Sequence, residues 1–587
     1  MKMPSKTGKN PSKAKWGSDV VVDLLKAYGI EYVAFNPGST FRGIEESLVN
    51  YGRNSEPEVI ECCHEEIAVA IAHGYAKATG KPMVAVLHDV VGTMHASMAI
   101  YNAFIDRVPI IILSGTGPMD TTKRRPFIDW IHTAQIQGNL VRDYVKWDDQ
   151  PANIASLPDS FMRAHKVATT EPKGPVYLCL DVDLQEDELK TAFTVPDVRL
   201  YAAPTRIAAD PAAIQRVAEL LVDSERPVII TDWLGRTPTA VENLIELAEL
   251  LAIPVIDLMG RFNFPNTHPL DLTGTDVVTN ADLILALDAP YLYQTLTVTD
   301  RDTRGSSYII PESTTIIQMG LDDIGIKSMA INYHKLQYAE MTITADTSIA
   351  LPQLLSACTR LIEKDPKQKE VYLERFSQLS AVHHEQRVKW REEARKLWDS
   401  EPVSLARLAS EVWDVIREED WVLVNGNRRG WVRRLWELTK PYQYLGHSGA
   451  AGLGYGMPAS LGAALAYRKT DKLCVNLQND GDLLQTCSSL WTGARHRLPL
   501  LIVMNNNQAY GNSVRHRRDV AKSRTRAENL MGTTIDDPLV DFAQMARSFG
   551  AYGEGPIEKP EAIRPALERM KKVVKEQRIP ALLDVLT

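Results

Sequence analysis

The stretch Gln478–Tyr510, "QNDGDLLQTCSSLWTGARHRLPLLIVMNNNQAY", contains two apolar runs with a helical segment between them. The first run ends in Asn-Asp-Gly around Asp480, and the second ends in three asparagines that close at Asn507. The 27 positions from one to the other are enough for a crossover helix and a strand, which is how neighbouring parallel strands are joined. Parallel strands end at one edge of a sheet, where ligands bind. The stretch therefore predicts a carboxylate and an amide oxygen side by side at that edge.

Asp480 and Asn507 both offer hard oxygen donors. Mg²⁺ takes such oxygens from a few protein ligands and completes its octahedron with water and phosphate oxygens. Asp-Gly and Asn-Asn are also common turn residues, which end strands without binding anything. Both interpretations are open from this stretch alone.

Apolar strand candidates alternate with helix-period segments along almost the whole chain. This alternation is typical of α/β domains. We predict three of them, each a parallel β-sheet flanked by helices. The predicted ranges are a flexible basic tail at 1–15, a first domain at 16–185, a linker at 186–205, a central domain at 206–362, a charged helical connector at 363–402 and a third domain at 403–587.

The composition is that of an ordinary globular protein, with 44% hydrophobic and 24% charged residues. A net charge of -8 argues against binding to nucleic acid or to an anionic membrane. No apolar run reaches about 18 residues, so no membrane span is expected. The six cysteines lack metal-finger spacing, and the Lys-rich start lacks the apolar core of a secretory signal. We therefore expect a reducing, cytoplasmic location.

The stretch also resembles the diphosphate-binding motif of thiamine-diphosphate-dependent enzymes, in the benzoylformate decarboxylase and acetolactate synthase branch. The likeness continues through "SSLWTGARHRLPLLIVMNNNQAYG". It implies that Asp480 and Asn507 are side-chain Mg²⁺ ligands and that the backbone carbonyl of Ala509 is the third ligand. The metal would then bridge the diphosphate of thiamine diphosphate, with Gly481, Tyr510 and Gly511 beside it.

Two residues depart from that motif. Asn479 replaces its first Gly, and Asn accepts the left-handed backbone that Gly often provides. Asp482 puts an acid where the family has a small residue. This acid either faces away from the diphosphate at a helix N-terminus or is offset by Arg428 or Arg429. In the same segment, "VNGNRRGW", the resemblance places Gly426 and Arg428 at the cofactor.

A second motif lies in the first domain, in "EVIECCHEEIAVAIAHGYAKATGKPMVAVLH". It resembles the pyrimidine-binding signature of the same family, and Glu65 falls on the position of the acid that protonates the aminopyrimidine. The neighbouring Glu66 is interpreted as an ordinary acid of a first helical turn. In "HSGAAGLGYGMPASLGAALA", the resemblance makes Leu453 the apolar wedge under the bent cofactor. It also makes the carbonyl of Ala451 an acceptor for the 4′-amino group.

Three further positions match the substrate pocket of benzoylformate decarboxylase. They are Ser39 in "NPGST", His88 in "LHDVVGT" and His268 in "RFNFPNTHP". An imidazole can protonate the enamine carbon after loss of CO₂, so these residues favour decarboxylation of a 2-oxo acid. Each histidine could equally be a polar loop residue.

The resulting hypothesis is a thiamine-diphosphate- and Mg²⁺-dependent lyase that cleaves the C1–C2 bond of a 2-oxo acid, with carboligation as a further activity. The alternatives are an acetolactate synthase-like carboligase, which would join a 2-oxo acid or an aldehyde, a 2-hydroxyacyl-CoA lyase and a non-catalytic homologue. The Met-Val-x-Gln-Trp stretch of acetolactate synthase is missing here, and no flavin-binding pattern is evident. The basic segment Arg515–Arg518 could contact an anionic substrate or coenzyme A, but we interpret it as a solvated loop.

One cofactor must meet both Glu65 and Asp480, which lie in different domains. The resembling family solves this between chains, so we expect a homodimer or a homotetramer with its sites at the subunit interface.

Overall fold

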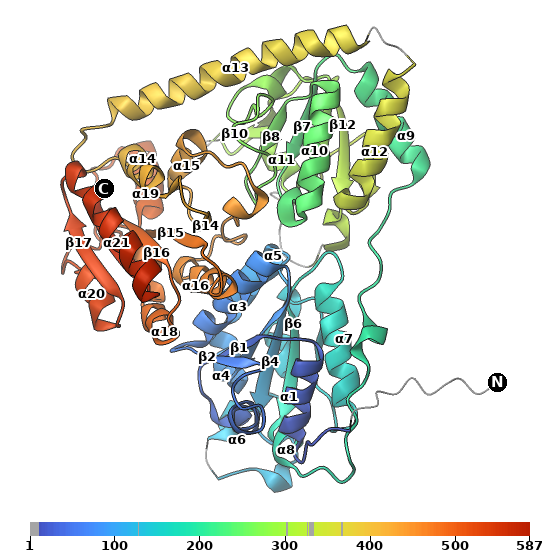
Figure 1. Cartoon of the computed structure of the whole chain (residues 1–587), viewed down its shortest axis with the longest axis vertical. Coiled ribbons are helices and arrows are strands. Elements are labelled where there is room, and N and C mark those ends of the chain that lie inside the picture. The colour runs from blue at the N-terminus through green and yellow to red at the C-terminus, as the bar shows by residue number, and fades with distance from the viewer. Residues whose placement is uncertain (1–10, 127, 301–302, 326, 328–333, 365–367) are drawn as a thin grey trace.

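The computed structural model describes residues 11–126, 128–300, 303–325, 327, 334–364 and 368–587. It contains three α/β units, each built on a parallel sheet with helices against its faces (Figure 1). This confirms the predicted fold class. In the described part of the chain, no helix is both long enough and apolar enough to cross a membrane.

The first domain has a six-stranded sheet in the order β2-β1-β3-β4-β6-β5, with all pairs parallel. Its strands are β1 (Tyr32–Phe35), β2 (Glu58–Glu61), β3 (Met83–Leu87), β4 (Ile110–Thr116), β5 (Asp148–Asp149) and β6 (Val176–Asp181). Its helices are α1 (Gly17–Ala27), α2 (Arg42–Glu46), α3 (Glu65–Thr79), α4 (Asp89–His95), α5 (Ser97–Ile105), α6 (Asp129–His132), α7 (Leu157–Thr169) and α8 (Val182–Glu186). The strands β3 and β4 are buried along their whole length, as the continuous apolar runs of a parallel sheet require.

The central domain has a five-stranded parallel sheet in the order β13-β12-β9-β7-β8. Its strands are β7 (Pro227–Thr231), β8 (Val255–Asp257), β9 (Leu283–Leu287), β12 (Thr315–Gly320) and β13 (Met341–Thr344), and β10 (Thr297–Thr299) pairs with β11 (Ser306–Tyr308) in a separate antiparallel ribbon. Its helices are α9 (Pro211–Asp223), α10 (Pro238–Leu251), α11 (Leu292–Thr295) and α12 (Thr347–Ile362).

A single long helix, α13 (Gln368–Lys396), runs over the surface from the central to the third domain (Figure 1). Most of its side chains are exposed, and four are buried: Tyr372, Arg387, Trp390 and Ala394. This sparse contact explains why its sequence is charged throughout and not amphipathic.

The third domain has a parallel sheet in the order β14-β15-β16-β18-β17. Its strands are β14 (Trp421–Asn425), β15 (Leu473–Asn479), β16 (Leu501–Asn506), β17 (Tyr552–Ile557) and β18 (Ala581–Leu586). Its helices are α14 (Leu405–Ile416), α15 (Trp431–Leu435), α16 (Gly456–Ala466), α17 (Asp480–Gln485), α18 (Ser489–Arg495), α19 (Gly511–Ser523), α20 (Phe542–Ser548) and α21 (Ile563–Gln577). In the register of β15 and β16, Asn479 lies opposite Asn505. The two polar strand ends are therefore neighbours, as the opening stretch predicts.

The first and third domains pack through α3 and α16, which lie side by side in Figure 1. A Cβ at Gly74 would lie 1.8 Å from the carbonyl oxygen of Ala459, and a Cβ at Gly462 would lie 2.0 Å from that of Ile71. Each helix thus has a glycine where the other backbone touches it. This close packing holds the first and third domains together, and it brings Glu66, near the start of α3, to the Gly454 loop of the third domain.

One local prediction is wrong, and one departure from the family motif has a simple explanation. Arg515–Arg518 belongs to the helix α19, not to a loop: the stretch 512–523 contains neither Gly nor Pro, and its buried Val514 packs against the domain. Asn479 has φ -109° and ψ 148°, an extended conformation open to any residue, so no left-handed backbone is needed before α17.

Candidate active site

Three oxygen atoms converge where β15 and β16 end. The side-chain oxygen of Asn507 lies 2.9 Å from the carbonyl oxygen of Ala509 and 3.1 Å from Oδ1 of Asp480. Turning the Asn507 amide over would convert both contacts into hydrogen bonds donated by its nitrogen. With the oxygen inward, three acceptors face one another without a proton between them. A cation between the three oxygens would stabilise this orientation of the amide, and hydrogen bonds to Ala509 and Asp480 would stabilise the turned one.

The spacing fits Mg²⁺. Its ligands lie at 2.0–2.1 Å in an octahedron, so adjacent ligand oxygens are separated by about 2.8–3.0 Å. The two distances from Asn507 are close to that range. Asp480 is 1% exposed, and its burial raises the pKa of the carboxyl group, which a bound cation would reverse. Asp480, Asn507 and Ala509, the predicted metal ligands, thus lie close together at the ends of the strands.

The carboxylate of Asp482 is turned toward the start of α16. It accepts hydrogen bonds from the backbone N–H of Gly454 at 2.8 Å and of Gly456 at 3.2 Å. The amide of Gln478 donates to it at 2.5 Å. Burial raises its pKa. Of the two interpretations given above, the structure favours the first: this acid holds the loop before α16 and the positive end of that helix.

Small residues line the edge beside the three oxygens. A Cβ on Gly481 would lie 2.7 Å from the ring of Tyr510, and a Cβ on Gly511 would lie 2.8 Å from the Asn507 amide. Gly426 has φ +88° at the end of β14, where a Cβ would lie 2.4 Å from the Leu477 carbonyl oxygen. These glycines let neighbouring parts of the third domain pack closely at the strand ends.

Arginine is also present at this edge, but at a position that the sequence prediction left undecided. Arg429 Nη2 is 3.5 Å from where a Cβ of Gly511 would be. The side chain of Arg428, the predicted contact, lies outside the described residues. Arg429 is thus the arginine that the described structure brings to the strand ends.

Leu453 and Ala451 lie on the loop that Asp482 holds. Leu453 is 43% exposed although it is a large apolar side chain, and Ala451 is exposed with φ +54°. The next residue, Gly452, lies against Met98 of the first domain, where a Cβ would be 2.3 Å from the Met98 methyl group. The loop therefore presents an uncovered apolar side chain near the boundary of the two domains.

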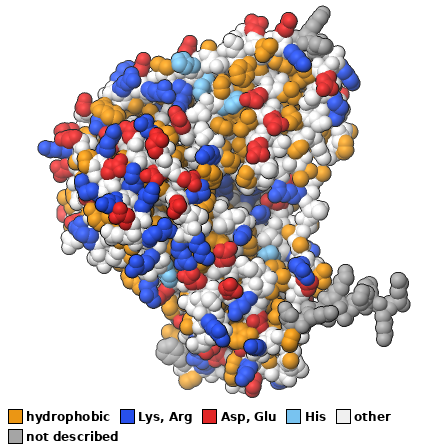
Figure 2. All heavy atoms as spheres, viewed as in Figure 1, with side chains coloured by type: hydrophobic (Ala, Val, Ile, Leu, Met, Phe, Trp, Pro, Cys, Tyr) orange, Lys and Arg blue, Asp and Glu red, His pale blue; other side chains and the backbone are white. Residues whose placement is uncertain are grey.

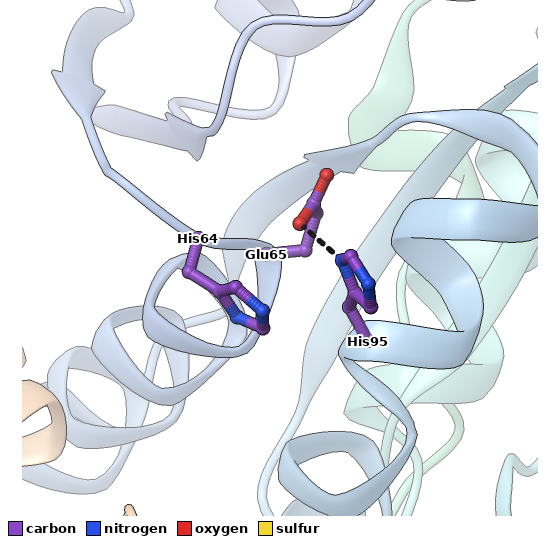
Figure 3. A group of neighbouring side chains, drawn as sticks. All are labelled: His64, Glu65 and His95. Carbon is purple, nitrogen blue, oxygen red and sulfur yellow. Dashed lines mark hydrogen bonds and ion pairs between the residues drawn. The ribbon is translucent and has the colours of Figure 1, made fainter. Parts of the chain in front are cut away.

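Glu65 is the first residue of α3 and is 3% exposed (Figure 3). Its Oε1 accepts a hydrogen bond from the Asn36 amide at 3.1 Å, and its Oε2 is 3.1 Å from Nδ1 of His95. Burial would raise the pKa of this carboxyl, but the hydrogen bonds from Asn36 and His95 outweigh it, so the pKa lies below the ordinary value. A Cβ on Gly92 would be 3.0 Å from Glu65 Cγ, so this glycine forms the wall beside the acid.

The imidazoles on either side of Glu65 stack on each other. The ring centroids of His64 and His95 are 4.7 Å apart, with 22° between the planes. His64 caps α3 by accepting the N–H of Glu66 at 3.2 Å. In Figure 3 the carboxylate of Glu65 points toward the His95 ring, not toward that of His64.

Glu66 differs from the ordinary first-turn acid that was expected. Its Oε1 is 3.2 Å from where a Cβ of Gly454 would be, on the loop of the third domain. Burial and the nearby charge of Asp482 raise its pKa to about 7. Asn36 and His95, the partners of Glu65, are the neighbours that spacing along the chain did not reveal.

The predicted pocket residues Ser39 and His88 lie near each other. Nδ1 of His88 is 3.0 Å from the hydroxyl of Thr40, the residue after Ser39. The Ser39 hydroxyl is buried and has no hydrogen-bond partner in the described structure. A buried polar group of this kind is rare in a protein interior and points to a missing ligand or water.

His268 lies elsewhere. Its Nε2 is 3.1 Å from the carboxylate of Glu249 on α10, and its ring packs against Phe264 at a centroid distance of 4.8 Å. Both partners belong to the central domain. Within one chain, the structure does not bring this histidine to His88.

A separate cavity of about 350 Å³ lies between the first and central domains. Arg107, Lys146 and Lys327 line it together with the rings of Trp233 and Tyr291. Figure 2 shows this face hollowed where the two domains meet, with Lys and Arg side chains around it. None of the predicted site residues lines this cavity.

Glu65 and the three oxygens of Asp480, Asn507 and Ala509 are not joined within the chain. Among the described residues, no hydrogen bond or ion pair links the two groups.

Known proteins of similar sequence and structure point to one family. Three domain models match in order: the N-terminal TPP binding domain of "Thiamine pyrophosphate enzyme" at residues 15–140, its central domain at 214–354 and its C-terminal TPP binding domain at 425–585. Glu65 lies in the first of these matches, and the three oxygens lie in the last.

Full-length relatives agree. A "Probable acetolactate synthase large subunit" of Methanocaldococcus jannaschii is 27% identical over 97% of this chain and 91% of its own length. Acetolactate synthase isozyme 3 large subunit of Escherichia coli is 24% identical over 94% of this chain and 92% of its own. The structure of benzoylformate decarboxylase from Polynucleobacter necessarius has a TM-score of 0.76 at 20% identity, covering 98% of this chain and 99% of that one. The chain therefore belongs to the thiamine pyrophosphate enzyme family.

Proposed function

We propose that this protein is a thiamine-diphosphate- and Mg²⁺-dependent lyase that cleaves the C1–C2 bond of a 2-oxo acid, with carboligation as a further activity. The observation that carries the proposal is the convergence of three oxygens at Asp480, Asn507 and Ala509 in the domain that matches the C-terminal TPP binding model. A buried acid, Glu65, stands in the domain that matches the N-terminal one.

In this proposal the three oxygens would hold Mg²⁺ at the diphosphate of the cofactor. Gly481, Tyr510 and Gly511 would lie beside the diphosphate, with Gly426 and Arg429 at the same edge. Leu453 and the Ala451 carbonyl would hold the rings. Bound thiamine diphosphate supplies the electron sink for cleavage next to a carbonyl.

In this scheme Glu65 gains and loses a proton, and its two carboxylate oxygens have different hydrogen-bond partners. The Asn36 amide can only donate, so Oε1 remains an acceptor. Nδ1 of His95 can donate or accept depending on the tautomer of the ring, so Oε2 is the oxygen that can be present with or without a proton. Asn36 orients the acid, and His95 sets how readily it takes up the proton.

Ser39 and His88 serve the substrate. The unpaired Ser39 hydroxyl can bind a substrate oxygen, and the imidazole of His88, 14% exposed, can hand a proton to the reacting carbon. His268 is retained as the second proton-handling histidine, which has to release Glu249 to act.

A second candidate is an acetolactate synthase-like carboligase, which the full-length similarity to acetolactate synthase large subunits favours. The two candidates differ in what happens after cleavage. In the first the fragment takes up a proton and leaves as an aldehyde, and in the second it joins another carbonyl compound.

A panel of 2-oxo acids tests the proposal. With Mg²⁺ and thiamine diphosphate present, we expect CO₂ release from at least one aliphatic or aromatic member without any acceptor. Release that requires a second 2-oxo acid or an aldehyde would favour the carboligase. No CO₂ from any member, with cofactor shown to be bound, would contradict both candidates.

A further inference from the structure

A second group of metal-binding atoms lies in the first domain, outside the Asp480 site. It consists of His88, which precedes α4, Asp89, the first residue of α4, and His132, the last residue of α6. The helices α4 and α6 are in contact and are drawn close together in Figure 1. Two segments more than 40 residues apart in the sequence thus contribute to one cluster.

The three donor atoms form a nearly regular triangle. Nε2 of His88 is 3.3 Å from Oδ2 of Asp89 and 3.3 Å from Nδ1 of His132, and the third side measures 3.5 Å. Zinc binds imidazole nitrogen and carboxylate oxygen at about 2.0–2.2 Å, so two ligands of a tetrahedral zinc ion are about 3.3–3.6 Å apart. All three sides agree with one face of such a tetrahedron.

The carboxylate of this cluster is in an unusual environment. Asp89 is 0% exposed, and buried carboxylates in proteins are paired or coordinate metals. Its backbone has φ +22°, outside the populated regions, and its Oδ1 accepts the N–H of Val91 at 3.0 Å. Strained backbone of this kind persists where the surrounding structure enforces it, often at functional sites. Here it directs Oδ2 toward both imidazoles.

The second nitrogen of the His88 ring has a partner of its own, which fixes the orientation of the ring. Its Nδ1 is 3.0 Å from the Thr40 hydroxyl, which leaves Nε2 for the cluster. The Gln185 amide in turn donates to the Thr40 carbonyl at 2.9 Å. A Cβ on Gly38 would lie 2.5 Å from the His88 Cβ, so only glycine lets the loop rest against this residue. Metal-binding histidines characteristically have such a partner on their second nitrogen.

We propose that His88, Asp89 and His132 bind a divalent cation of the zinc class, with the fourth tetrahedral position open to water or a small anion. Two nitrogens and one carboxylate oxygen with a fourth open position are a ligand set of catalytic zinc sites. The other cluster of possible ligands, His64, Glu65 and His95, is less suitable. Its two rings are stacked with 22° between their planes, and Nδ1 of His64 already accepts the N–H of Glu66.

The location suggests what such an ion would do. The helix α4 that begins at Asp89 also carries Gly92, the wall beside Glu65. Water on zinc loses a proton near neutral pH and could take over the proton transfer assigned above to His88. Only this last step depends on the proposed function, because metal binding itself can be measured without turnover.

The test uses the full-length protein, freed of transition metals with a chelator and then saturated with Mg²⁺ and thiamine diphosphate to fill the Asp480 site. Zn²⁺ is then added in excess, and we expect one equivalent per chain to remain bound after gel filtration. Co²⁺ in its place should give the intense visible absorption of a tetrahedral site. His132→Ala and Asp89→Asn should each lose the bound zinc and the cobalt spectrum.

Matched variants separate the possible sites. His95→Ala at the stacked cluster, Glu65→Gln and His384→Ala on the exposed face of α13 should all keep one zinc. Thr40→Val should weaken zinc affinity about 10- to 100-fold by removing the group behind His88. The proposal is overturned if the wild-type protein retains no zinc. It is also overturned if His95→Ala loses the zinc while His132→Ala keeps it. If the Glu65→Gln protein is inactive but still retains zinc, this result supports the zinc site whatever reaction the protein catalyses.

Discussion

Glu65 and Glu66 are adjacent in sequence, yet their carboxylates lie in different surroundings. Glu65 contacts Asn36 and His95 inside the first domain, whereas Glu66 faces the Gly454 loop of the third. Replacing Glu65 by Gln keeps the size of the side chain but removes its exchangeable proton. We expect thiamine diphosphate to stay bound and the exchange of its C2 hydrogen to slow by about 10²–10⁴-fold.

Hydrogen exchange at C2 can be followed by NMR in D₂O after rapid quenching. Glu66→Gln is the matched control and should exchange within a few-fold of the wild type. Equal rates in Glu65→Gln and wild type would show that this acid plays no part in activation.

Asp584 offers a test by pH. It lies on β18 beside β16 and is 1% exposed, and neither of its oxygens has a hydrogen-bond partner of normal geometry among the described residues. Burial raises its pKa to about 6, against a smaller lowering by the nearby Asn506 amide. The folded state therefore holds this proton more tightly than the unfolded state. Its contribution to stability is complete below about pH 4 and is lost as the pH rises to about 6.

Asp584→Asn keeps the neutral form at every pH. At pH 7.5 it should exceed the wild type in unfolding free energy by roughly 2–3 kcal/mol, and the gap should close near pH 4. Thermal melting of metal-free protein across this range measures the difference. Asp471→Asn, an exposed carboxyl in the same domain, is the control and should follow the wild type. If the difference in unfolding free energy between Asp584→Asn and the wild type were the same at every pH, Asp584 would not be a buried acid.

Among the elements, the loop before α16 is held by a side chain from the next helix, α17. Asp482 accepts two backbone N–H groups there, much as an N-cap residue does. Asp482→Ala should destabilise the conformation of the loop that carries Leu453 by about 0.5–2 kcal/mol. We expect thiamine diphosphate to bind about 2- to 30-fold more weakly, while Mg²⁺ dependence remains.

Equilibrium dialysis with and without Mg²⁺ measures both quantities. Asp480→Ala gives the contrasting result, since it should abolish most binding. A loss in Asp482→Ala as complete as in Asp480→Ala would show that Asp482 contacts the cofactor itself.

The elements also show how far the sequence could predict this fold. β15 and β16 were predictable because apolar runs end abruptly in polar residues. β17, "YGEGPI", was not, because its two glycines and one proline argue against a strand, and they are tolerated here because β17 is the edge of the sheet. α19 was missed because its apolar positions show no helical period and only Val514 is buried.

The same contrast holds for the candidate site. That Asp480 and Asn507 lie together follows from local spacing along one strand-helix-strand unit, whereas the part of Ala509 is implied only by the resemblance to the family. The partners of Glu65 do not follow from spacing, since Asn36 and His95 are 29 and 30 residues away and meet it only through the first-domain sheet. Nor could spacing show that Asp482 would turn toward α16.

At the scale of the whole molecule, the two halves of the proposed site lie in separate domains, and no described hydrogen bond or ion pair joins Glu65 to the Asp480 group. The exposed Leu453 lies near the boundary of these domains, where a second chain could cover it. We therefore propose a homodimer, or a homotetramer made of two such dimers. In each dimer, Glu65 of one chain and the three oxygens of the other would serve one cofactor.

Subunit mixing tests this central claim most directly. Glu65→Gln and Asp480→Ala chains should each be inactive alone. After equal mixing and subunit exchange, half of the dimers contain one chain of each kind, with one site carrying both changes and the other carrying neither. We predict recovery of about a quarter of wild-type activity on the substrate found in the 2-oxo acid panel. No recovery, despite mixed dimers demonstrated by native mass spectrometry, would contradict a site shared between chains.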